Sequence, residues 1–315
     1  MKSERLYRIA CLIRQVELKI VEVYDQDIMQ TPVHLSIGQE AIASAVCAHL
    51  NNDDLVLGTH RSHALYLAKG GSPTELFAEL LGRVNGCSGG YGGSMHLIDI
   101  KHGLLGTSAL VGGSLPIAVG MAMGIERPRI AAVIFGDGAC DEGVFYESLN
   151  FARLKRVPLI FVCENNRYSV YTHIKKRRCV TGRAIAKASQ IKTIYVPIEV
   201  ANDAVALYRL LDKPLRAIRK GDGPLFVECE TVRTADHHGV EDDIKKGFRP
   251  ESEGDLAKKY DPLLLMKKYL KDDIAERIQR EVKEEVERAF TVALRSKPLR
   301  IRVNYEQLGD STKTA

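Results

Sequence analysis

Apolar residues recur every three or four positions in several parts of the chain, which is the spacing of one face of a helix. In residues 4–24 the series is Leu6, Ile9, Ile13, Val16, Ile20 and Val23. Residues 73–83 are expected to form another helix, because the pair Ser72-Pro73 is typical of a helix start: serine caps the first turn, and proline fits inside it. Further helices are expected at 203–220 and in the charged stretch 261–294.

Two alanine-rich stretches also predict helices. Residues 36–49 open with Ser36 and carry Gln39 three positions later, which is the spacing of a capping box. Residues 110–124 are small and apolar, which predicts a buried helix after a glycine turn. By contrast, residues 86–93 contain too much glycine for a regular helix or strand.

Continuous apolar runs predict strands at 130–135, 158–163, 193–198 and 224–231. A strand that is apolar on both sides is typical of a parallel sheet covered on both faces. A helix through Val144, Leu149 and Leu154 joins the first two strands and completes a βαβ unit. The alternation predicts an α/β fold, with a mostly parallel sheet, helices on both faces and a helical C-terminal region.

Length and composition agree with one globular domain. The chain has 315 residues, of which 45% are hydrophobic, and it contains no repeats or low-complexity tract. We expect a single domain over residues 1–308, followed by a polar tail at 309–315.

The cysteines and the N-terminus bear on location. Seven cysteines are widely spaced and form no C-x-x-C pair, which argues against a disulfide framework or zinc ribbon and favours a reducing compartment. No signal peptide, transit peptide or membrane-spanning run is apparent. The sequence therefore predicts a cytoplasmic protein that does not bind a membrane.

The charge of the chain excludes few further classes of function. The net charge is +5, and basic residues gather only at Lys175–Arg178. Such a run could touch nucleic acid or anionic lipid, but it is more often a solvated surface segment. Because no nucleic-acid motif accompanies it, nucleic-acid binding is not expected.

Polar residues end the first two predicted strands. Gly136-Asp137-Gly138 follows the first, and Glu164-Asn165-Asn166 ends the second. Since ligands of open α/β sheets bind where strands end, Asp137 and Asn166 are expected to meet at one rim. Carboxylate and amide oxygens suit Mg2+, which prefers phosphates and water as its other ligands. The flanking glycines and the next helix's N-terminus could bind the phosphates.

Either half of this pattern alone is typical of an ordinary turn or loop. The joint pattern is more specific, because strand, GDG, helix, strand and NN follow in order with 26 residues between Gly138 and Asn165. The chain has neither a G-x-G-x-x-G after a strand nor a G-x-x-x-x-G-K-[ST] loop, so nicotinamide dinucleotides and simple nucleotide hydrolysis lose support. The sequence predicts a metal-bridged diphosphate site.

GDG followed by NN resembles the thiamine-diphosphate-binding motif. The segment GDGACDEGVFYESLNFARLKRVPLIFVCENNRYSVYTH resembles the alpha subunits of the E1 components of 2-oxo acid dehydrogenases, a group that includes pyruvate, branched-chain and acetoin dehydrogenases. The likeness covers nearly the whole chain, through HLSIGQEA, THRSHALYLAKGG, GGYGGSMH, LVGGSLPIAVG, GPLFVECETVR and DHHG. It implies a thiamine-diphosphate-binding fold with thiamine diphosphate and Mg2+ as cofactors.

The resemblance assigns the metal and diphosphate contacts. Asp137 and Asn166 would ligate Mg2+, with the backbone carbonyl of Tyr168 as a third protein ligand. Gly138 and Ala139 would offer backbone N–H groups to the diphosphate.

The other cofactor contacts come from earlier in the chain. Arg61 would pair with the diphosphate, and His60 stands where many relatives have tyrosine. The Val111 backbone would contact the aminopyrimidine ring. Ala109 replaces a glycine that is common in the family at that contact.

Three histidines receive catalytic positions from the same resemblance. His237 matches the histidine of a loop that closes on the diphosphate, and His34 and His63 match positions that line the active-site channel. His60 and His63 are spaced like weak zinc ligands, but no nearby cysteine or carboxylate completes that set. His238 stands where relatives from animal mitochondria carry a phosphorylated serine, so that control is not expected.

The resemblance also implies the reaction and the partners. The cofactor would cleave a 2-oxo acid or acetoin, and the acyl fragment would pass to a lipoyl group on a separate E2 protein. A beta subunit would supply the glutamate that activates the cofactor, in an α2β2 heterotetramer. Two alternatives stay open at this point: an E1-like decarboxylase or carboligase without a lipoyl partner, and a non-catalytic diphosphate-binding scaffold.

Overall fold

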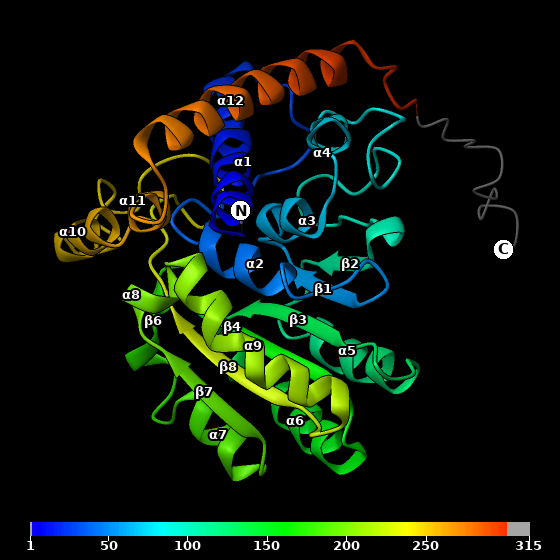
Figure 1. Cartoon of the computed structure of the whole chain (residues 1–315). Helices are drawn as coiled ribbons and strands as arrows, with labels where there is room; N and C mark the ends of the chain where they lie inside the picture. The colour runs from blue at the N-terminus through cyan, green and yellow to red at the C-terminus, as the bar shows by residue number, and fades with distance from the viewer. Residues whose placement is uncertain (1, 301–315) are drawn as a thin grey trace, which may run out of the picture.

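The computed structural model describes residues 2–300 and is built around a six-stranded parallel sheet (Figure 1). Its strand order is β2-β1-β3-β4-β8-β7, and every neighbouring pair is parallel. The strands are β1 (Leu55–Thr59), β2 (Leu104–Ser108), β3 (Ala131–Gly136), β4 (Leu159–Asn165), β7 (Lys192–Val196) and β8 (Leu225–Glu230). All the strands of this sheet therefore end at the same edge.

The apolar runs form strands because alternate side chains are buried on opposite faces of the sheet. One face packs Val56, Ala132, Ile134, Ile160, Val162, Leu225 and Val227 into the larger core. The other packs Leu57, Ala131, Val133, Phe135, Leu159, Phe161 and Phe226 into a second core. Both faces of the central strands are therefore buried.

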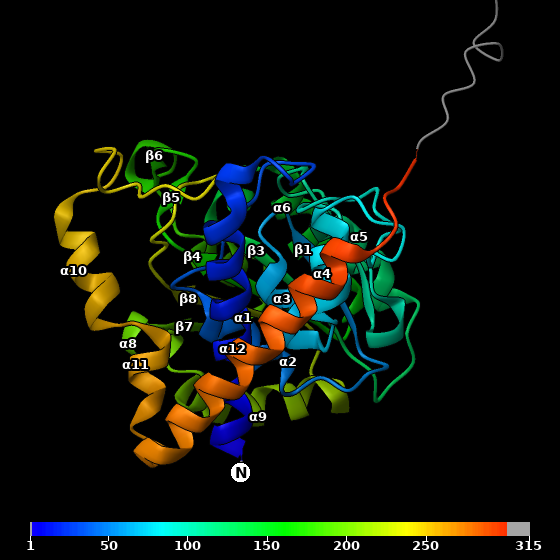
Figure 2. The ribbon, with the colours of Figure 1, turned by 90° about the horizontal axis from the view of Figure 1, so that it is seen from above.

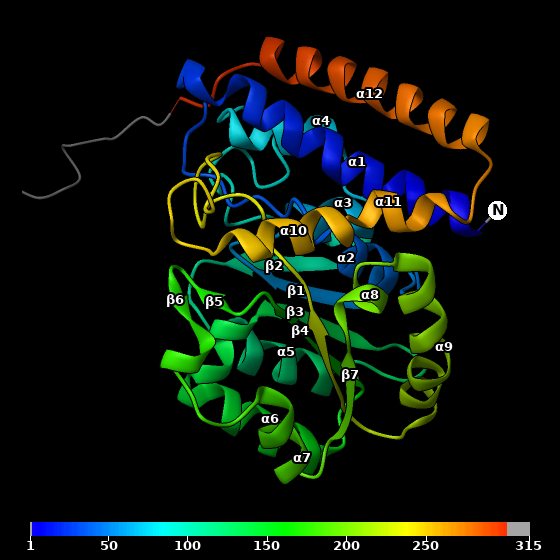
Figure 3. The same cartoon turned by 90° about the vertical axis from the view of Figure 1, so that its left-hand side faces the viewer.

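Helices cover the first face in two layers, as Figure 3 shows. The inner helices are α2 (Glu40–Cys47), α3 (His63–Lys69) and α9 (Ala204–Lys220). Outside them lie α1 (Lys2–Val23), α4 (Pro73–Leu80) and α12 (Asp272–Arg295). Figure 2 shows α12 crossing α1, so the two ends of the described chain pack against each other.

The opposite face is covered by α5 (Ser114–Met123), α6 (Gly143–Lys155) and α7 (Gly182–Ala188). The remaining α-helices are α8 (Ile198–Ala201), α10 (Glu251–Lys259) and α11 (Pro262–Lys267). Short 3-10 helices are η1 (Tyr24–Gln26), η2 (Ile100–His102), η3 (Asp137–Asp141) and η4 (Ile174–Lys176). A small antiparallel hairpin consists of β5 (Tyr168–Ser169) and β6 (Thr172–His173).

None of the helices described between residues 2 and 300 combines the length and apolar character needed to cross a membrane.

The predicted α/β fold class is confirmed, with helices on both faces and a helical C-terminal region. The helices predicted at 4–24, 73–83 and 203–220 form at nearly those limits, and Ser72 caps α4 as expected. The four predicted strands are β3, β4, β7 and β8. The tail expected at 309–315 lies outside the described residues.

The capping box predicted at Ser36 is wrong. α2 begins at Glu40, and Gln39 is its N-cap without a side-chain capping bond. The backbone N–H of Ser36 instead donates to both carboxylate oxygens of Glu17, at 2.8 Å each. Gly38 has φ +94°, a left-handed conformation that interrupts any helix starting at Ser36.

Two other predicted helices differ in extent. The stretch 110–124 is helical only from Ser114 and is not fully buried, since Leu110 is 74% and Ile117 59% exposed. The stretch 261–294 is helical as predicted and contains two helices, α11 and α12. The short strands β1 and β2 were not predicted, because the apolar run in each is only two or three residues long before glycine and threonine interrupt it.

The glycine-rich segment 86–93 is held by one carboxylate. Glu79 is fully buried and accepts hydrogen bonds from the backbone N–H groups of Ser88, Gly90, Gly92 and Gly93 at 2.6–3.2 Å. A Cβ on Gly90, where φ is +85°, would lie 2.5 Å from a backbone oxygen of Arg83. The segment therefore has no regular structure, as predicted, but a defined conformation.

Replacing Glu79 with alanine should lower the free energy of unfolding by about 2–4 kcal/mol, because four backbone N–H groups, two of them buried, lose their acceptor. Urea denaturation followed by circular dichroism measures this change. Glu276→Ala on the exposed face of α12 is the matched control and should change stability little. Equal stability of the two variants would show that Glu79 does not hold the segment.

Candidate functional site

A cavity opens at the edge where the strands of the main sheet end. Its walls come from the ends of β1, β2, β3, β4 and β8 and the segments that follow them, together with the loop before α2 and Met95 from the segment between α4 and β2. The lining residues are His34, Gln39, Thr59, His60, Arg61, Met95, Ala109, Val111, Gly112, Gly136, Gly138, Ala139, Glu164, Asn166, Tyr168, Ser169, Val170, Arg233 and His237. Parallel strands bring these distant segments together because their carboxyl ends share one edge.

Asp137 lies at the end of β3 and is fully buried. Its Oδ2 pairs with the Arg177 guanidinium, whereas its Oδ1 has no hydrogen-bond partner within residues 2–300. Burial raises the pKa of Asp137, and the charge of Arg177 opposes that rise. A buried carboxylate oxygen without a partner fits a hard divalent cation, which would supply the missing interaction.

Asn166 follows the neighbouring strand β4, in which Glu164 pairs with Gly136. Its Oδ1 accepts the N–H of Tyr168 at 3.1 Å and a nitrogen of Arg249 at 3.4 Å. Its Nδ2 donates to Gln39 at 3.2 Å. The Arg249 guanidinium also stacks over the Tyr168 ring, so the turn carrying the predicted ligands is held by side-chain contacts on several sides.

Backbone at the end of β3 is open to the cavity. A Cβ on Gly136 would meet no atom within 4 Å, whereas one on Gly138 would lie 2.8 Å from the Ser169 hydroxyl. The 3-10 helix η3 begins at Asp137, and α6 starts only at Gly143. The first backbone N–H groups available to a phosphate are therefore those of the 3-10 turn that contains Gly138 and Ala139.

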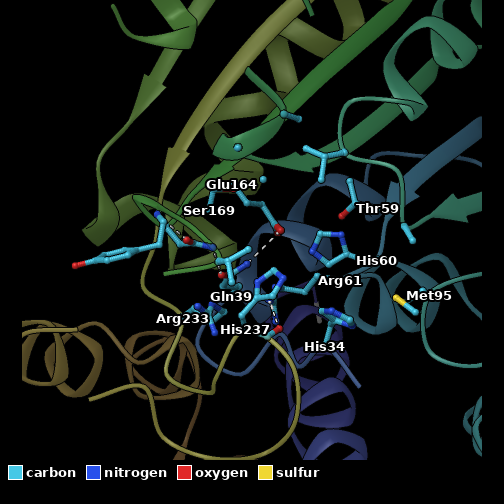
Figure 4. Close-up of a pocket in the computed structure, with 18 of the residues that line it drawn as sticks. His34, Gln39, Thr59, His60, Arg61, Met95, Glu164, Ser169, Arg233 and His237 are labelled. Atoms are coloured by element: carbon cyan, nitrogen blue, oxygen red, sulfur yellow. Dashed lines mark hydrogen bonds between the residues drawn. The ribbon is translucent and has the colours of Figure 1, made fainter. Parts of the chain in front are cut away.

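Three histidines from distant segments meet at the cavity (Figure 4). The ring centroids of His34, His60 and His237 lie 4.7–5.4 Å apart, and one ligand atom from each ring lies within 4.8 Å of the others. Burial first, and then the charge of Arg61, lower their pKa values to about 2, 4 and 3, respectively. All three rings are therefore neutral at pH 7.

The surroundings of these rings favour an anionic ligand over a metal cation. Arg61 donates to the backbone oxygens of Leu35 and His237, the latter at 2.9 Å. Burial lowers the pKa of Arg61 to about 9, so its guanidinium still carries a charge at pH 7. A divalent ion among the rings would be repelled by Arg61, whereas a carboxylate or phosphate would be attracted.

Glu164 is a lining residue that the sequence did not single out. Burial raises its pKa to about 8, although the charge of Arg61 opposes the shift. Gln39 donates to its carboxyl group at 3.2 Å (Figure 4). The sequence does mark Glu164, because it places a carboxylate at the end of an otherwise apolar strand. The Glu-Asn-Asn pattern alone does not indicate what this carboxylate does.

Arg233 was missed as well. It is fully buried and pairs with Asp243 at 2.7 Å, and Asp243 also accepts from Arg249 at 3.1 Å. These pairs hold the segment after β8 that carries His237. No spacing rule reveals such a network, because its members meet only through the folding of a long loop.

Ten of the predicted residues line this cavity, and two do not. The ten that line it are His60, Arg61, Ala109, Val111, Gly138, Ala139, Asn166, Tyr168, His34 and His237. Asp137 is fully buried and is not a lining residue, but it lies between Gly136 and Gly138, both of which line the cavity. His63, which was expected to line the channel, does not: it is the first residue of α3 and is fully buried. Its Nε2 bonds the Ser94 hydroxyl at 2.9 Å, and its Nδ1 lies 3.4 Å from Glu17.

Comparison with known proteins identifies the family. The model of the dehydrogenase E1 component family matches residues 7–302. The alpha subunit of acetoin:2,6-dichlorophenolindophenol oxidoreductase from Bacillus subtilis is 34% identical over 239 residues, covering 75% of this chain and 71% of the relative. The chloroplastic pyruvate dehydrogenase E1 component subunit alpha-3 of Arabidopsis thaliana is 32% identical over 304 residues, covering 91% and 70%.

A third relative is of mitochondrial origin. The pyruvate dehydrogenase E1 component subunit alpha of Sminthopsis macroura is 33% identical over 301 residues, covering 92% of this chain and 80% of the relative. All three similar proteins are alpha subunits. The family match spans nearly the whole chain, so the protein belongs to the dehydrogenase E1 component family, as an alpha-type subunit.

Proposed function

We propose that this alpha subunit binds thiamine diphosphate through Mg2+ and acts in the oxidative cleavage of a 2-oxo acid or of acetoin. Family membership makes the chain part of an oxidoreductase that uses thiamine diphosphate. The relatives carry the names of a pyruvate dehydrogenase and of an acetoin oxidoreductase, and both substrate classes remain within the proposal. The observation that carries it is the unpartnered buried Oδ1 of Asp137 next to backbone that is open to the cavity.

The residues at the strand ends would hold the cofactor's diphosphate. Asp137, Asn166 and the Tyr168 carbonyl would ligate Mg2+, and the N–H groups of Gly138 and Ala139 would bind phosphate oxygens. When bound, thiamine diphosphate supplies the carbanion and the electron sink that the cleavage needs. The protein contributes binding, orientation and proton transfer.

The histidine cluster would handle the substrate. A neutral imidazole can accept a proton or hydrogen-bond a carbonyl, and three such rings face one cavity. Arg61 gives that part of the cavity a positive charge, which suits the cofactor's diphosphate, the group with which the resemblance pairs this residue. Glu164, whose pKa is about 8, would be mostly protonated at pH 7 and able to donate a hydrogen bond.

A beta subunit would complete the site, in the proposed α2β2 assembly, and a lipoyl group on an E2 protein would accept the acyl fragment. Exposed apolar residues gather around α5, where Leu110, Val111, Ile117 and Met123 are all at least 46% exposed. Val111 also lines the cavity. An apolar surface continuous with the cavity is what a site shared between two subunits requires.

Asp137→Asn should weaken thiamine diphosphate binding in the presence of Mg2+ by about 100-fold or more, because the amide lacks the charge that the metal needs. Isothermal titration of the assembled protein measures this loss. Asp273→Asn, on the exposed first turn of α12, removes the same charge elsewhere and should bind normally. Normal cofactor binding by the Asp137 variant would refute the metal site.

Artificial-acceptor reduction with pyruvate, acetoin and branched 2-oxo acids would then identify the substrate. Turnover of one of them by the assembled protein, and not by the Asp137 variant, is the expected result. Tight cofactor binding without turnover of any of these substrates would contradict the proposed reaction and favour another carbonyl substrate.

The imidazoles of His34, His60 and His237 should stay neutral down to about pH 5, because their pKa values are lowered to 4 or less. In the unfolded chain they take up protons near pH 6.5. Between these limits the unfolded state binds more protons, so the free energy of unfolding should fall as the pH drops from 7 to 5.

Nitrogen-15 NMR of labelled histidine measures the ring charge directly. The same sample in urea is the control and should titrate near pH 6.5. Protonation of the three folded-state rings above pH 6 would contradict the burial of the cluster.

Ile117→Asp should weaken association with the beta subunit by at least about tenfold while leaving the chain folded, because a carboxylate would be buried in an apolar contact. Analytical ultracentrifugation of mixed subunits measures the affinity. Glu147→Gln, on the exposed surface of α6, is the control. Unchanged assembly of the Ile117 variant would place the interface elsewhere.

A further inference from the structure

The basic segment Lys175–Arg178 divides into two exposed and two inward-facing side chains. Lys175 and Lys176 are exposed and form no ion pair within the described residues. The Arg177 and Arg178 side chains are only 11% and 10% exposed. The segment is therefore not the solvated surface run that its composition suggests, because half of its charge points into the protein.

The two arginines face the acidic end of the metal site. Arg177 pairs with Asp137 through one terminal nitrogen and with Asp141 through the other. Arg178 lies 3.6 Å from the second carboxylate oxygen of Asp141. These four side chains form one cluster, which we call the Asp137–Arg177 quartet: Asp137, Asp141, Arg177 and Arg178.

Local structure holds Arg177 in this place. The β5–β6 hairpin returns the chain toward η3, and the N–H of Ile174 donates to the Arg167 carbonyl at 2.7 Å. The Arg177 Nε donates to the Thr172 carbonyl at 3.1 Å. The guanidinium is thus fixed by its own hairpin as well as by the two carboxylates.

The quartet has no net charge, since two carboxylates offset two guanidinium groups. A divalent cation that approaches Asp137 Oδ1 gains the attraction of one carboxylate but meets the repulsion of Arg177 on the other oxygen of the same group. A diphosphate brings several negative charges to the same place. Its attraction for the cation then outweighs the repulsion by Arg177. Metal alone should therefore bind weakly, and metal with diphosphate tightly.

We propose that Arg177 is a built-in counter-cation at the metal-binding carboxylate, which makes divalent-metal binding conditional on the diphosphate. The inference rests on the proposed metal site at Asp137. It adds that the two ligands bind as a coupled pair, and that the coupling comes from this side chain. By linkage, each ligand then raises the affinity for the other by the same factor.

If Arg177 served only to orient Asp137, its removal would change the metal affinity in the opposite direction. A guanidinium that only holds Oδ2 so that Oδ1 points at the metal would strengthen metal binding, and its removal would weaken it. A counter-cation weakens the binding of metal alone, and its removal strengthens it. The direction of the change in metal affinity therefore separates the two roles.

The experiment measures Mn2+ binding to the assembled α–β protein by electron paramagnetic resonance, with and without saturating thiamine diphosphate. Wild type should bind Mn2+ at least about 30-fold more tightly when the cofactor is present. Arg177→Gln should bind Mn2+ alone about tenfold more tightly than wild type, and its coupling factor should fall accordingly. Arg177→Lys keeps the charge and should stay close to wild type.

Lys176→Gln is the matched control, because it removes one positive charge from the same segment without touching the quartet; it should behave as wild type. Unchanged or weaker Mn2+ binding by Arg177→Gln, or equal affinity of wild type with and without the cofactor, would overturn the inference. Asp137→Asn identifies the site being titrated. Absence of any Mn2+ site sensitive to Asp137 would refute the proposed metal site itself, and the inference with it.

Discussion

Pairing of β3 with β4 places Gly136 opposite Glu164, and the arrangement of the site depends on this register. Both strands are buried on their two faces, so a slip of one residue would turn every core side chain to the wrong core. With the register fixed, the turns that follow must emerge together at one edge. The turns that carry Asp137 and Asn166 follow neighbouring strands at that edge because packing on both faces of the sheet fixes the register.

Around this edge, several buried charged side chains bind partners from distant parts of the chain. Glu17 binds the backbone of Ser36, and Glu79 holds the glycine-rich segment. Arg233 and Arg249 share Asp243 beside the Asn166 turn. Such pairs add little to stability once desolvation is counted, but breaking one is costly. Their role here is to define single conformations for loops that have no regular structure.

The sequence was informative where the chemistry is local or repeated. The apolar runs of β3 and β4 identified the core of the sheet, and the GDG and NN motifs at their ends were enough to locate the site. Prediction failed where a residue's environment is set by distant segments. Ser36 has the spacing of a helix cap, yet Glu17 takes its N–H, and His63 sits in a recognisable motif, yet it packs against Ser94 away from the cavity. The inward turn of Arg177 follows from the β5–β6 hairpin, whose two-residue strands carry no periodic signal.

The histidine cluster and the Asp137–Arg177 quartet balance charge in different ways. Around His34, His60 and His237, burial first and then the charge of Arg61 keep the three imidazoles neutral, so Arg61 offers positive charge to an anionic ligand without a cluster of protonated rings. At the strand-end site, two arginines already balance two carboxylates, so neither a cation nor an anion alone matches the local charge. The proposed metal-bound diphosphate carries both signs and would match both kinds of group. Selectivity for such a complex can therefore arise from charge balance within the protein, before any contact with the rest of the ligand is made.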